Sequence, residues 1–530
     1  MIKQIFHKTI AVLLVTLAMA ACTKDLDREP FYDATSASVY QDFNNYKLIL
    51  AKLYAGIAVS GQQGPAGKPD ISGIDEGFSS YWRQYWQLQE LTTDEAVIGW
   101  NDGTIAQLHY MTWTPANEFI GALYNRFFYQ IALCNEFIRE TSDDKLSGRG
   151  IGGANLEDAK KFRSEARFLR ALSYYHAMDL FGNVPFVTEQ DAVGSFFPRQ
   201  ISRTELFNYI ESELLGLETE LTAAKQNEYG RADAAAVWSL LAKMYLNSEV
   251  YTTRAKYTEA ISYASKVINA GFTLQPDYSH LFLADNNNSP EIIFPIVYDG
   301  LRIKSYGGMT YLVHAPVGGN MSPADFGING GWSGLRTTKN VVNLFPDPNA
   351  TADKRGMFHT SGQSIDVTEI PTFTDGYPIT KFRNVTSTGV KGSDPAGDFP
   401  DTDFPMFRLA DIYLIYAEAV LRGGSGGDRA TALQYINALR QRAYGNASGN
   451  INDGQLTLDF ILDERGRELN WEATRRTDLI RFGKFTSSSY VWPWKGQVLE
   501  GKGVEDYRTL FPIPSSDLTA NPNLHQNPGY

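Results

Sequence analysis

Residues 231–271 read "RADAAAVWSLLAKMYLNSEVYTTRAKYTEAISYASKVINAG", and this stretch decides the fold. Its apolar residues recur at helical spacing, which predicts two amphipathic helices that lie antiparallel. Small side chains allow the two helices to approach closely: Ala235, Ala242, Ala260 and Ala264. Three larger rings are expected to fill the space between them: Tyr245, Tyr257 and Tyr263.

A second helical pair is predicted at 407–445, where "IYAEAVL" echoes the "LLAKMYL" of the first pair. Two such pairs resemble tetratricopeptide repeats, in which each pair buries its apolar face against the next. Further helices are predicted at 38–58, 164–182, 203–222 and 461–485. Ser202 is expected to cap one of them and Gly182 to end another. The expected fold is therefore all-α, or mainly α, with helical repeats at about 158–271 and 407–485.

The segment between the repeats, about 272–400, has a different composition. It is rich in Gly, Pro, Asn, Thr and aromatic residues, and it contains strand-like runs such as "EIIFPIV" and "MTYLV". We expect a long loop-rich insertion that carries short strands. Long loops on a rigid scaffold are where binding residues usually lie.

The N-terminus has the pattern of a targeting segment. Lys3 and Lys8 accompany an apolar run that is too short to span a bilayer and that ends in "LAMAAC" at Cys22. This resembles a bacterial lipobox, which predicts a signal peptide at 1–21, a lipid on Cys22, a polar tether at 22–37 and a single domain at 38–530. A plain secretory signal is the alternative. The expected protein is anchored to a membrane rather than embedded in it.

Charge and cysteine content narrow the range of partners. The chain carries a net charge of −12, which disfavours nucleic acid and anionic lipid headgroups and favours a neutral partner. If Cys22 carries a lipid, Cys134 is the remaining thiol and no internal disulfide forms. The apolar helical pattern around Cys134 predicts a buried core residue.

Catalytic motifs are absent from the sequence: there is no HExxH, no G-x-S-x-G and no P-loop. Asp75–Glu76 and Asp94–Glu95 are candidates for the paired carboxylates of a glycoside hydrolase, but adjacent acids are more often solvated or hydrogen-bonded. Alternating charges at 464–481 indicate an internal ion-pair network rather than an anion site. We therefore expect a protein that is not an enzyme.

Aromatic residues on Gly-rich loops are the best candidates for binding. Trp100 lies in "IGWNDGT", Tyr306 in "IKSYGGMTY" and Trp332 in "GINGGWSG". A neutral sugar has apolar C–H faces that stack on flat rings and hydroxyls that need polar neighbours, and glycines clear the ring faces. The denser cluster "YWRQYWQLQE", 81–90, is expected to be mainly core, since its rings recur at spacings of three and four.

A metal site is predicted more weakly. In "ADNNNSPE", 284–291, oxygen-bearing residues alternate as at the start of a calcium loop, but the glycine and the bidentate acid of an EF-hand are missing. A looser calcium site that combines this loop with Asp401 or Asp403 remains open, and so does a solvated turn.

Several motifs together resemble the SusD/RagB family of surface glycan-binding lipoproteins from Bacteroidetes. They include the lipobox, "SEARFLRALSYYHAMDLFGNVPFV", "DTDFPMFRLADIYLIYAEA", "ERGRELNWEATRRTDLIRFGKF" and the C-terminal "FPIPSSDL". Loops such as "LTTDEAVIGW", "YGGMTYLV" and "NGGWSG" are similar to those of the starch-binding member. The resemblance implies a shallow site that holds α-glucan without cutting it, as part of a lid over a SusC-like TonB-dependent transporter in the outer membrane, facing the cell exterior.

The resemblance also implies roles for individual residues. The arc of stacking rings would be formed by Trp100, Tyr306 and Trp332, with Asp75, Arg83 and Asn101 as hydrogen-bonding partners. Calcium, if bound, would be held by Asn287, Asp401 and Asp403. Two departures weaken the match: Ile98 stands in place of a further tryptophan, and Asn287 in place of an aspartate.

Three other interpretations remain open at this stage. The first is a protein of the same family that binds a different neutral glycan. The second is a tetratricopeptide-type adaptor whose ligand is a protein. The third is a glycoside hydrolase.

Overall fold

The computed structural model describes residues 36–65, 67–194 and 196–530. The predicted signal peptide, the lipid on Cys22 and nearly all of the predicted tether lie outside these residues. Within them, no helix combines the length and the apolar character that a membrane crossing requires.

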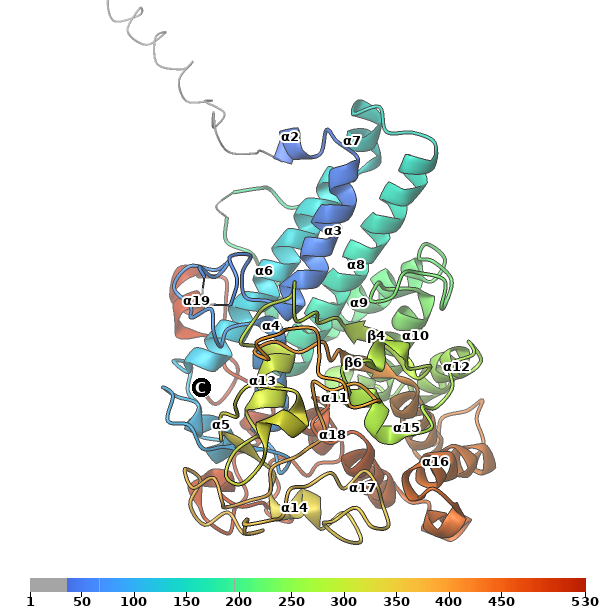
Figure 1. Cartoon of the computed structure of the whole chain (residues 1–530). Helices are drawn as coiled ribbons and strands as arrows, with labels where there is room; N and C mark the ends of the chain where they lie inside the picture. The colour runs from blue at the N-terminus through green and yellow to red at the C-terminus, as the bar shows by residue number, and fades with distance from the viewer. Residues whose placement is uncertain (1–35, 66, 195) are drawn as a thin grey trace, which may run out of the picture.

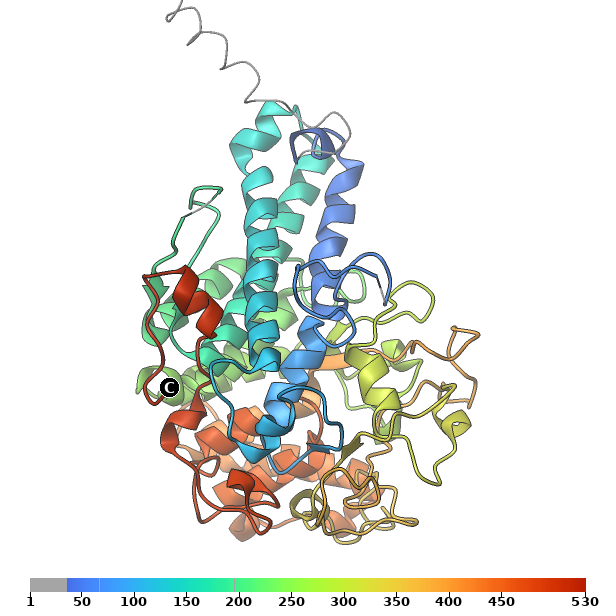
Figure 2. The same ribbon diagram turned by 90° about the vertical axis from the view of Figure 1, so that its left-hand side faces the viewer.

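Three long helices form a pillar at one end of the molecule: α3 (Asn44–Ala58), α6 (Glu118–Glu140) and α8 (Ala154–Phe181). They lie side by side and pack on one another (Figures 1 and 2). The predicted end of α8 at Gly182 is confirmed, since this glycine has a φ of 71° and ends the helix. Cys134 is buried in α6, as predicted.

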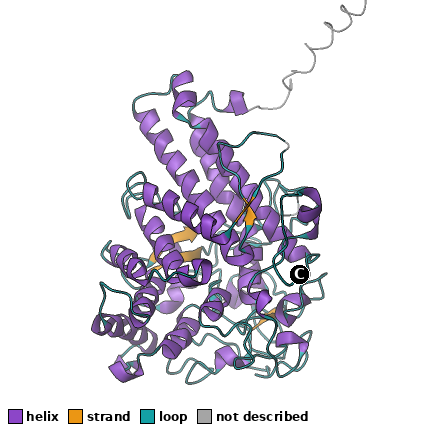
Figure 3. Cartoon of the chain, turned by 180° about the vertical axis from the view of Figure 1, so that it is seen from behind, coloured by secondary structure: helices purple, strands orange, loops and turns teal. Residues whose placement is uncertain are grey.

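The helical repeats continue from this pillar. Their helices are α9 (Arg203–Leu217), α10 (Ala234–Leu246), α12 (Tyr257–Ile268), α15 (Leu409–Leu421) and α16 (Arg429–Tyr444). Each packs on the next in this order, so the second predicted pair stacks directly on the first although the insertion separates them in sequence. Ser202 caps α9 in a reciprocal capping box with Glu205. The mainly α, repeat-like fold is confirmed, and helices dominate the view in Figure 3.

The insertion is closed at its base by a pair of antiparallel strands. Strand β4 (Ile292–Ile296) lies shortly after α12, and β6 (Phe404–Arg408) leads directly into α15. The predicted strand "EIIFPIV" is therefore confirmed. Because both ends of the insertion pair with each other, its loops are held against the repeats, and they gather around α13 and α14 away from the tip of the pillar (Figure 1).

The remaining elements are short, apart from α4 and α17. The helices are α2 (Ser36–Val39), α4 (Tyr81–Glu90), α5 (Ala106–Tyr110), α7 (Asp143–Gly148), α11 (Ser248–Thr252), α13 (Gly308–His314), α14 (Lys339–Val342), α17 (Leu458–Glu468), α18 (Arg475–Arg481) and α19 (Ser515–Ala520). Two further antiparallel strand pairs join β1 (Val97–Ile98) to β5 (Leu335–Arg336) and β2 (Val184–Pro185) to β3 (Gln200–Ile201).

The strand prediction for "MTYLV" is wrong, since these residues form helix α13. All five side chains from Met309 to Val313 are buried. A run that is buried on every side shows no periodicity that separates a strand from a helix. Gly308 opens the helix at a φ of 53°, and a Cβ there would lie 1.8 Å from the Tyr298 hydroxyl.

Two predicted helices are interrupted. The segment 461–485 divides into α17 and α18, because Trp471 and Ala473 adopt φ angles of 61° and 58° between them. The segment 38–58 becomes regular only from Asn44, whose N–H donates to the Asp42 carboxylate at 3.0 Å. The positive φ angles and the local bond to Asp42 depend on contacts that helical periodicity does not reveal.

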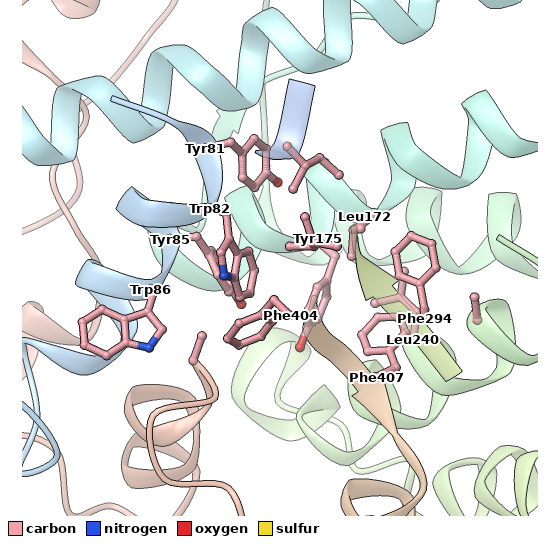
Figure 4. Close-up of a cluster of buried hydrophobic side chains, with 14 of the residues drawn as sticks. Tyr81, Trp82, Tyr85, Trp86, Leu172, Tyr175, Leu240, Phe294, Phe404 and Phe407 are labelled. Atoms are coloured by element: carbon pink, nitrogen blue, oxygen red, sulfur yellow. The ribbon is translucent and has the colours of Figure 1, made fainter. Parts of the chain in front are cut away.

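The aromatic cluster on α4 lies in the core, as predicted. Tyr81, Trp82 and Trp86 are no more than 1% exposed, and the Trp82 ring packs 4.3 Å from that of Phe404 on β6. The cluster continues past α8 to Phe294 and Phe407 of the β4–β6 pair (Figure 4). All ten residues of α4 are buried, because this helix packs against α3 and α6 of the pillar, α13 of the insertion and α18.

The alternating charges at 464–481 form a buried ion-pair network, which confirms their structural role. On α17, Glu468 accepts hydrogen bonds from Arg355 at 3.0 Å, Arg408 at 2.7 Å and Arg442. Burial alone raises the pKa of the Glu468 carboxyl, but the three guanidinium groups outweigh it and hold the pKa well below its usual value. One carboxylate thus links the end of β6, helix α16 and the loop at Arg355.

Replacing Glu468 with Gln removes the charge that three buried guanidinium groups share. We expect the free energy of unfolding to fall by about 3–5 kcal/mol, the usual cost of breaking a buried ion pair. Glu157→Gln is the matched control, because Glu157 pairs with Lys160 on an exposed surface and should cost less than about 1 kcal/mol. Urea unfolding measures both values. Equal losses in the two variants would contradict the role given to Glu468.

Candidate functional site

The three predicted stacking rings come together, although more than 200 positions of the sequence separate the first from the others. Trp100 follows β1 and Trp332 precedes β5, so the antiparallel pairing of these strands brings them side by side. The Trp100 indole N–H donates to the Trp332 carbonyl oxygen at 3.1 Å. Ring centroids lie 6.1 Å apart for Trp100 and Trp332, and 6.5 Å for Trp332 and Tyr306.

The rings are partly exposed and supported from the protein side. Tyr306 is 37% exposed, and both tryptophans are half-buried. The His314 ring stacks on Trp332 at 4.9 Å, while Tyr311 meets Trp100 edge-on at 5.9 Å. Both supporting residues come from α13. Because their own contacts fix them, the three rings form a rigid surface rather than a set of mobile side chains.

Glycines make this arrangement sterically feasible. A Cβ on Gly334 would lie 2.4 Å from the Trp100 ring, and a Cβ on Gly307 would lie 1.8 Å from the Ser80 hydroxyl. A Cβ added to Gly331 would also clash, because it would lie 2.1 Å from the Val317 carbonyl oxygen. The glycines therefore let the loops approach each other and the rings closely.

Arg83 lies at the edge of the rings. It projects from α4, and its guanidinium donates to the carbonyl oxygens of Gly77 at 3.2 Å and Tyr306 at 3.3 Å. It also lies 4.4 Å from the centroid of Tyr311 and 5.8 Å from that of Trp100. Burial lowers the pKa of Arg83, and Tyr311 and two nearby aspartates oppose this. Within the described residues its Nε–H has no hydrogen-bond partner, and this atom is buried beneath the rings rather than open to solvent.

Asp75 and Asn101 are both exposed. Asp75 shapes the loop before α4, because its Oδ1 accepts the N–H groups of Gly77 at 2.7 Å and Phe78 at 3.0 Å. Asn101 directly follows Trp100. Ile98 is fully buried in β1 and adds nothing to the exposed surface.

Sequence reasoning missed the supporting residues Tyr311 and His314. They are three positions apart, which places them on one side of a helix, but the strand interpretation of "MTYLV" hid this relation. Asp102 was missed as well. It follows Asn101, is exposed, and opposes the effect of burial on the pKa of Arg83.

The predicted calcium ligands fit a metal site only in part. Asp401 accepts hydrogen bonds from the Gly300 N–H and from Ser393, and Asp403 accepts them from the Tyr229 hydroxyl and the Tyr298 N–H. Asn286, rather than Asn287, pairs with the backbone of Asp403. In the described parts of the chain, no group of three or more His, Cys, Asp or Glu residues is arranged to hold a metal ion. Calcium binding stays a prediction.

The Asp94–Glu95 pair has a structural role. Both oxygens of Asp94 accept from Arg475 at 2.8 Å, and the Tyr490 hydroxyl donates to it at 2.6 Å. Glu95 accepts the Trp471 N–H at 2.6 Å, and the Trp471 indole donates to its backbone carbonyl. These carboxylates hold the break between α17 and α18, and they are buried rather than presented at the rings.

These features define a class: a helical-repeat protein whose loops present a surface of partly exposed aromatic rings. A family model described as the SusD family matches residues 358–530. The starch-binding protein SusD of Bacteroides thetaiotaomicron is 35% identical over an alignment that covers 100% of this chain and 99% of the relative. A SusD-like protein of Bacteroides ovatus is 25% identical, with 99% and 98% coverage. The chain belongs to the SusD family.

Solved structures agree on the fold. A SusD superfamily protein from Bacteroides thetaiotaomicron matches with a TM-score of 0.70 at 20% identity, covering 92% of this chain and 99% of that one. Surface glycan-binding protein A from the same organism, in complex with laminarihexaose, matches with a TM-score of 0.67 at 18% identity, covering 91% and 99%.

The buried carboxyls of Glu90 and Glu95 should make the free energy of unfolding depend on pH. Burial raises the pKa of both, that of Glu90 from 4.5 to about 7. Glu90 therefore ionises at a lower pH in the unfolded chain than in the folded one. As the pH rises from 4.5 to about 7, the contribution of Glu90 to the free energy of unfolding should fall by up to roughly 3 kcal/mol. Glu90→Gln should remove this slope.

Urea unfolding of both proteins between about pH 4.5 and pH 7.5 measures the slope as the difference between them. The difference matters because other buried groups also make the free energy of unfolding depend on pH in this interval. Burial lowers the pKa of His109 and His176 from 6.5 to about 3 and raises that of Asp403 from 3.8 to about 7. Parallel curves for the two proteins would contradict the prediction.

Proposed function

We propose that this protein binds glycans at the cell surface and that it captures starch or a related α-glucan without cleaving it. The observation that carries the proposal is the surface formed by Trp100, Tyr306 and Trp332, which we call the three-ring arc. Its rings lie at successive centroid distances of 6.1 and 6.5 Å, and Arg83 lies at its edge.

The geometry of the three-ring arc suits a sugar chain. Apolar C–H faces of pyranose rings stack on aromatic faces, and the hydroxyls at their edges need hydrogen-bonding partners. Asp75, Asn101 and Asp102 are exposed polar side chains in the loops that flank Arg83, and they can bond sugar hydroxyls. Such a shallow surface supports weak, multivalent capture of a polymer rather than deep enclosure of a small molecule.

The relative orientation of the rings favours a curved ligand. Neighbouring planes are inclined by 49° between Trp100 and Trp332 and by 62° between Trp332 and Tyr306. A chain that follows these planes must turn, as a helical α-glucan does, whereas an extended chain would leave one plane. The whole-length similarity to a protein named for starch binding supports the same choice.

A different neutral glycan is the second candidate. A structure with this fold holds laminarihexaose, so the fold by itself does not select starch. A protein-binding adaptor is the third, since helical repeats often bind proteins.

The cellular setting is part of the proposal. A lipid on Cys22 would anchor the chain to the outer membrane with its loops facing the exterior, and a SusC-like TonB-dependent transporter would receive the captured glycan. The net charge of −12 supports a neutral ligand and disfavours nucleic acid. Calcium at Asn287, Asp401 and Asp403 is a separate prediction from family resemblance, and the binding of glycan does not require it.

Replacing Trp100 and Trp332 together with alanine tests the three-ring arc. We expect the affinity for maltoheptaose to fall by roughly 10-fold or more, since each lost ring removes a stacking contact. Calorimetry gives the affinity. Gel retardation against amylopectin, pullulan, dextran and laminarin separates α-glucan from other neutral glycans.

Trp238→Ala is the matched control. Trp238 is half-buried on α10 in the helical repeats, and its indole N–H donates to Glu218 at 3.0 Å. This variant should bind as the wild type does. Glycan binding that survives the double replacement would overturn the three-ring arc, and release of reducing ends from amylopectin would favour a hydrolase.

A further inference from the structure

Another ring lies next to the three-ring arc. Phe373, on the loop between β5 and β6, is half-buried. The Ser333 hydroxyl and the Phe373 ring edge lie 2.3 and 2.8 Å from the point where a Cβ on Gly318 would sit. Since Ser333 directly follows Trp332, the Phe373 ring lies beside the chain that carries Trp332, the middle ring of the arc. Gly318 and Gly319 leave the space that the ring needs.

A buried arginine fixes the loop on both sides of Phe373. The Arg336 guanidinium donates to the carbonyl oxygens of Thr372 at 3.0 Å and Asp375 at 2.9 Å, and also to that of Ile370. The Gln363 amide donates to the carbonyl of Phe373 itself at 3.0 Å. These bonds fix the backbone that carries the ring.

The same guanidinium also supports Trp100. Its Nη1 donates at 2.8 Å to the carbonyl of Gly334, the residue that lies against the Trp100 ring. Gly99 must be a glycine here, because a Cβ would lie 2.8 Å from this Nη1. One buried group therefore holds Trp100 and Phe373 in a constant relation to each other.

Burying the Arg336 guanidinium in this way lowers the stability of the fold, because the charge loses its hydration. It makes no ion pair with a carboxylate among the described residues, and burial lowers its pKa to about 10. A packing role alone would be met by an apolar side chain. A guanidinium with several carbonyl acceptors instead orders an exposed loop before a ligand arrives, which reduces the entropy lost on binding.

The surroundings of Phe373 are polar, with several neutral side chains at the surface and the Asp375 carboxylate two residues along the loop. Exposed hydroxyl and amide side chains are Asn320, Ser333, Ser361, Thr372 and Thr374. Asn320 is oriented by Ser361 at 3.0 Å and by His359 at 2.7 Å. A partly exposed ring with a border of neutral donors and acceptors suits a sugar unit.

We propose that Phe373 is a fourth stacking ring, which widens the three-ring arc beside its middle ring, Trp332, and that Arg336 is its positioning residue. The site then takes a longer run of sugar units than the three-ring arc alone can stack. This inference rests on the proposed glycan-binding function and specifies the length of ligand that the site prefers.

The test is a series of chain lengths. Calorimetry with maltotriose, maltopentaose and maltoheptaose gives the gain in affinity as the chain grows. In Phe373→Ala we expect the gain from maltotriose to maltoheptaose to shrink by about 3- to 10-fold, the effect of one stacking contact. Phe373→Tyr, which keeps the ring, should retain the gain.

Arg336→Lys loses the fork of donors and should reduce the same gain, with little further loss when it is combined with Phe373→Ala.

The outcomes separate this inference from the proposed function. If the wild type binds no glycan in the panel, both the proposed function and the fourth ring are overturned. A wild type that binds while Phe373→Ala loses affinity equally for every length, or for none, overturns the fourth ring alone. Phe197→Ala, at a 60% exposed phenylalanine in the loop before β3, controls for general loss of surface apolar area.

Discussion

Glu468 and the three guanidinium groups around it form the contact on which the rest of the structure depends. Arg408 ends β6, Arg442 lies on α16 and Arg355 lies in the insertion, so the three partners come from different layers of the fold. Buried charges tolerate little displacement, because a guanidinium that loses its carboxylate is left desolvated without a partner. The network therefore fixes the relative positions of the repeats and the base of the insertion.

A short route leads from this network to the exposed rings. Beyond α17 the chain turns at Trp471, whose N–H and indole bind Glu95, and Arg475 of α18 binds Asp94. Asp94 and Glu95 lie just before β1. Strand β1 pairs with β5, and this pairing brings Trp100 and Trp332 together. The three-ring arc is thus held by interior ion pairs and hydrogen bonds, not by its exposed loops alone.

The helical repeats were predictable because apolar residues recur at helical spacing, most clearly in α12, where Ala260, Ile261, Ala264 and Val267 form the buried side. The candidate rings were predictable because glycines flank Trp100, Tyr306 and Trp332, and close approach requires such glycines. Residues that depend on tertiary contacts were not predictable. The helical state of "MTYLV", the break at Trp471 and the role of Arg336 follow from partners that are distant in sequence, and Phe373 carries no local signal at all.

The most direct measurement is fluorine NMR of the protein labelled with 5-fluorotryptophan, titrated with maltoheptaose. Trp82 and Trp86 are buried in α4, whereas Trp100 and Trp332 are half-buried in the three-ring arc. The account predicts that the resonances of Trp100 and Trp332 shift together with one affinity while those of Trp82, Trp86 and Trp238 stay in place. Saturable shifts confined to other tryptophans, with Trp100 and Trp332 unmoved, would contradict it.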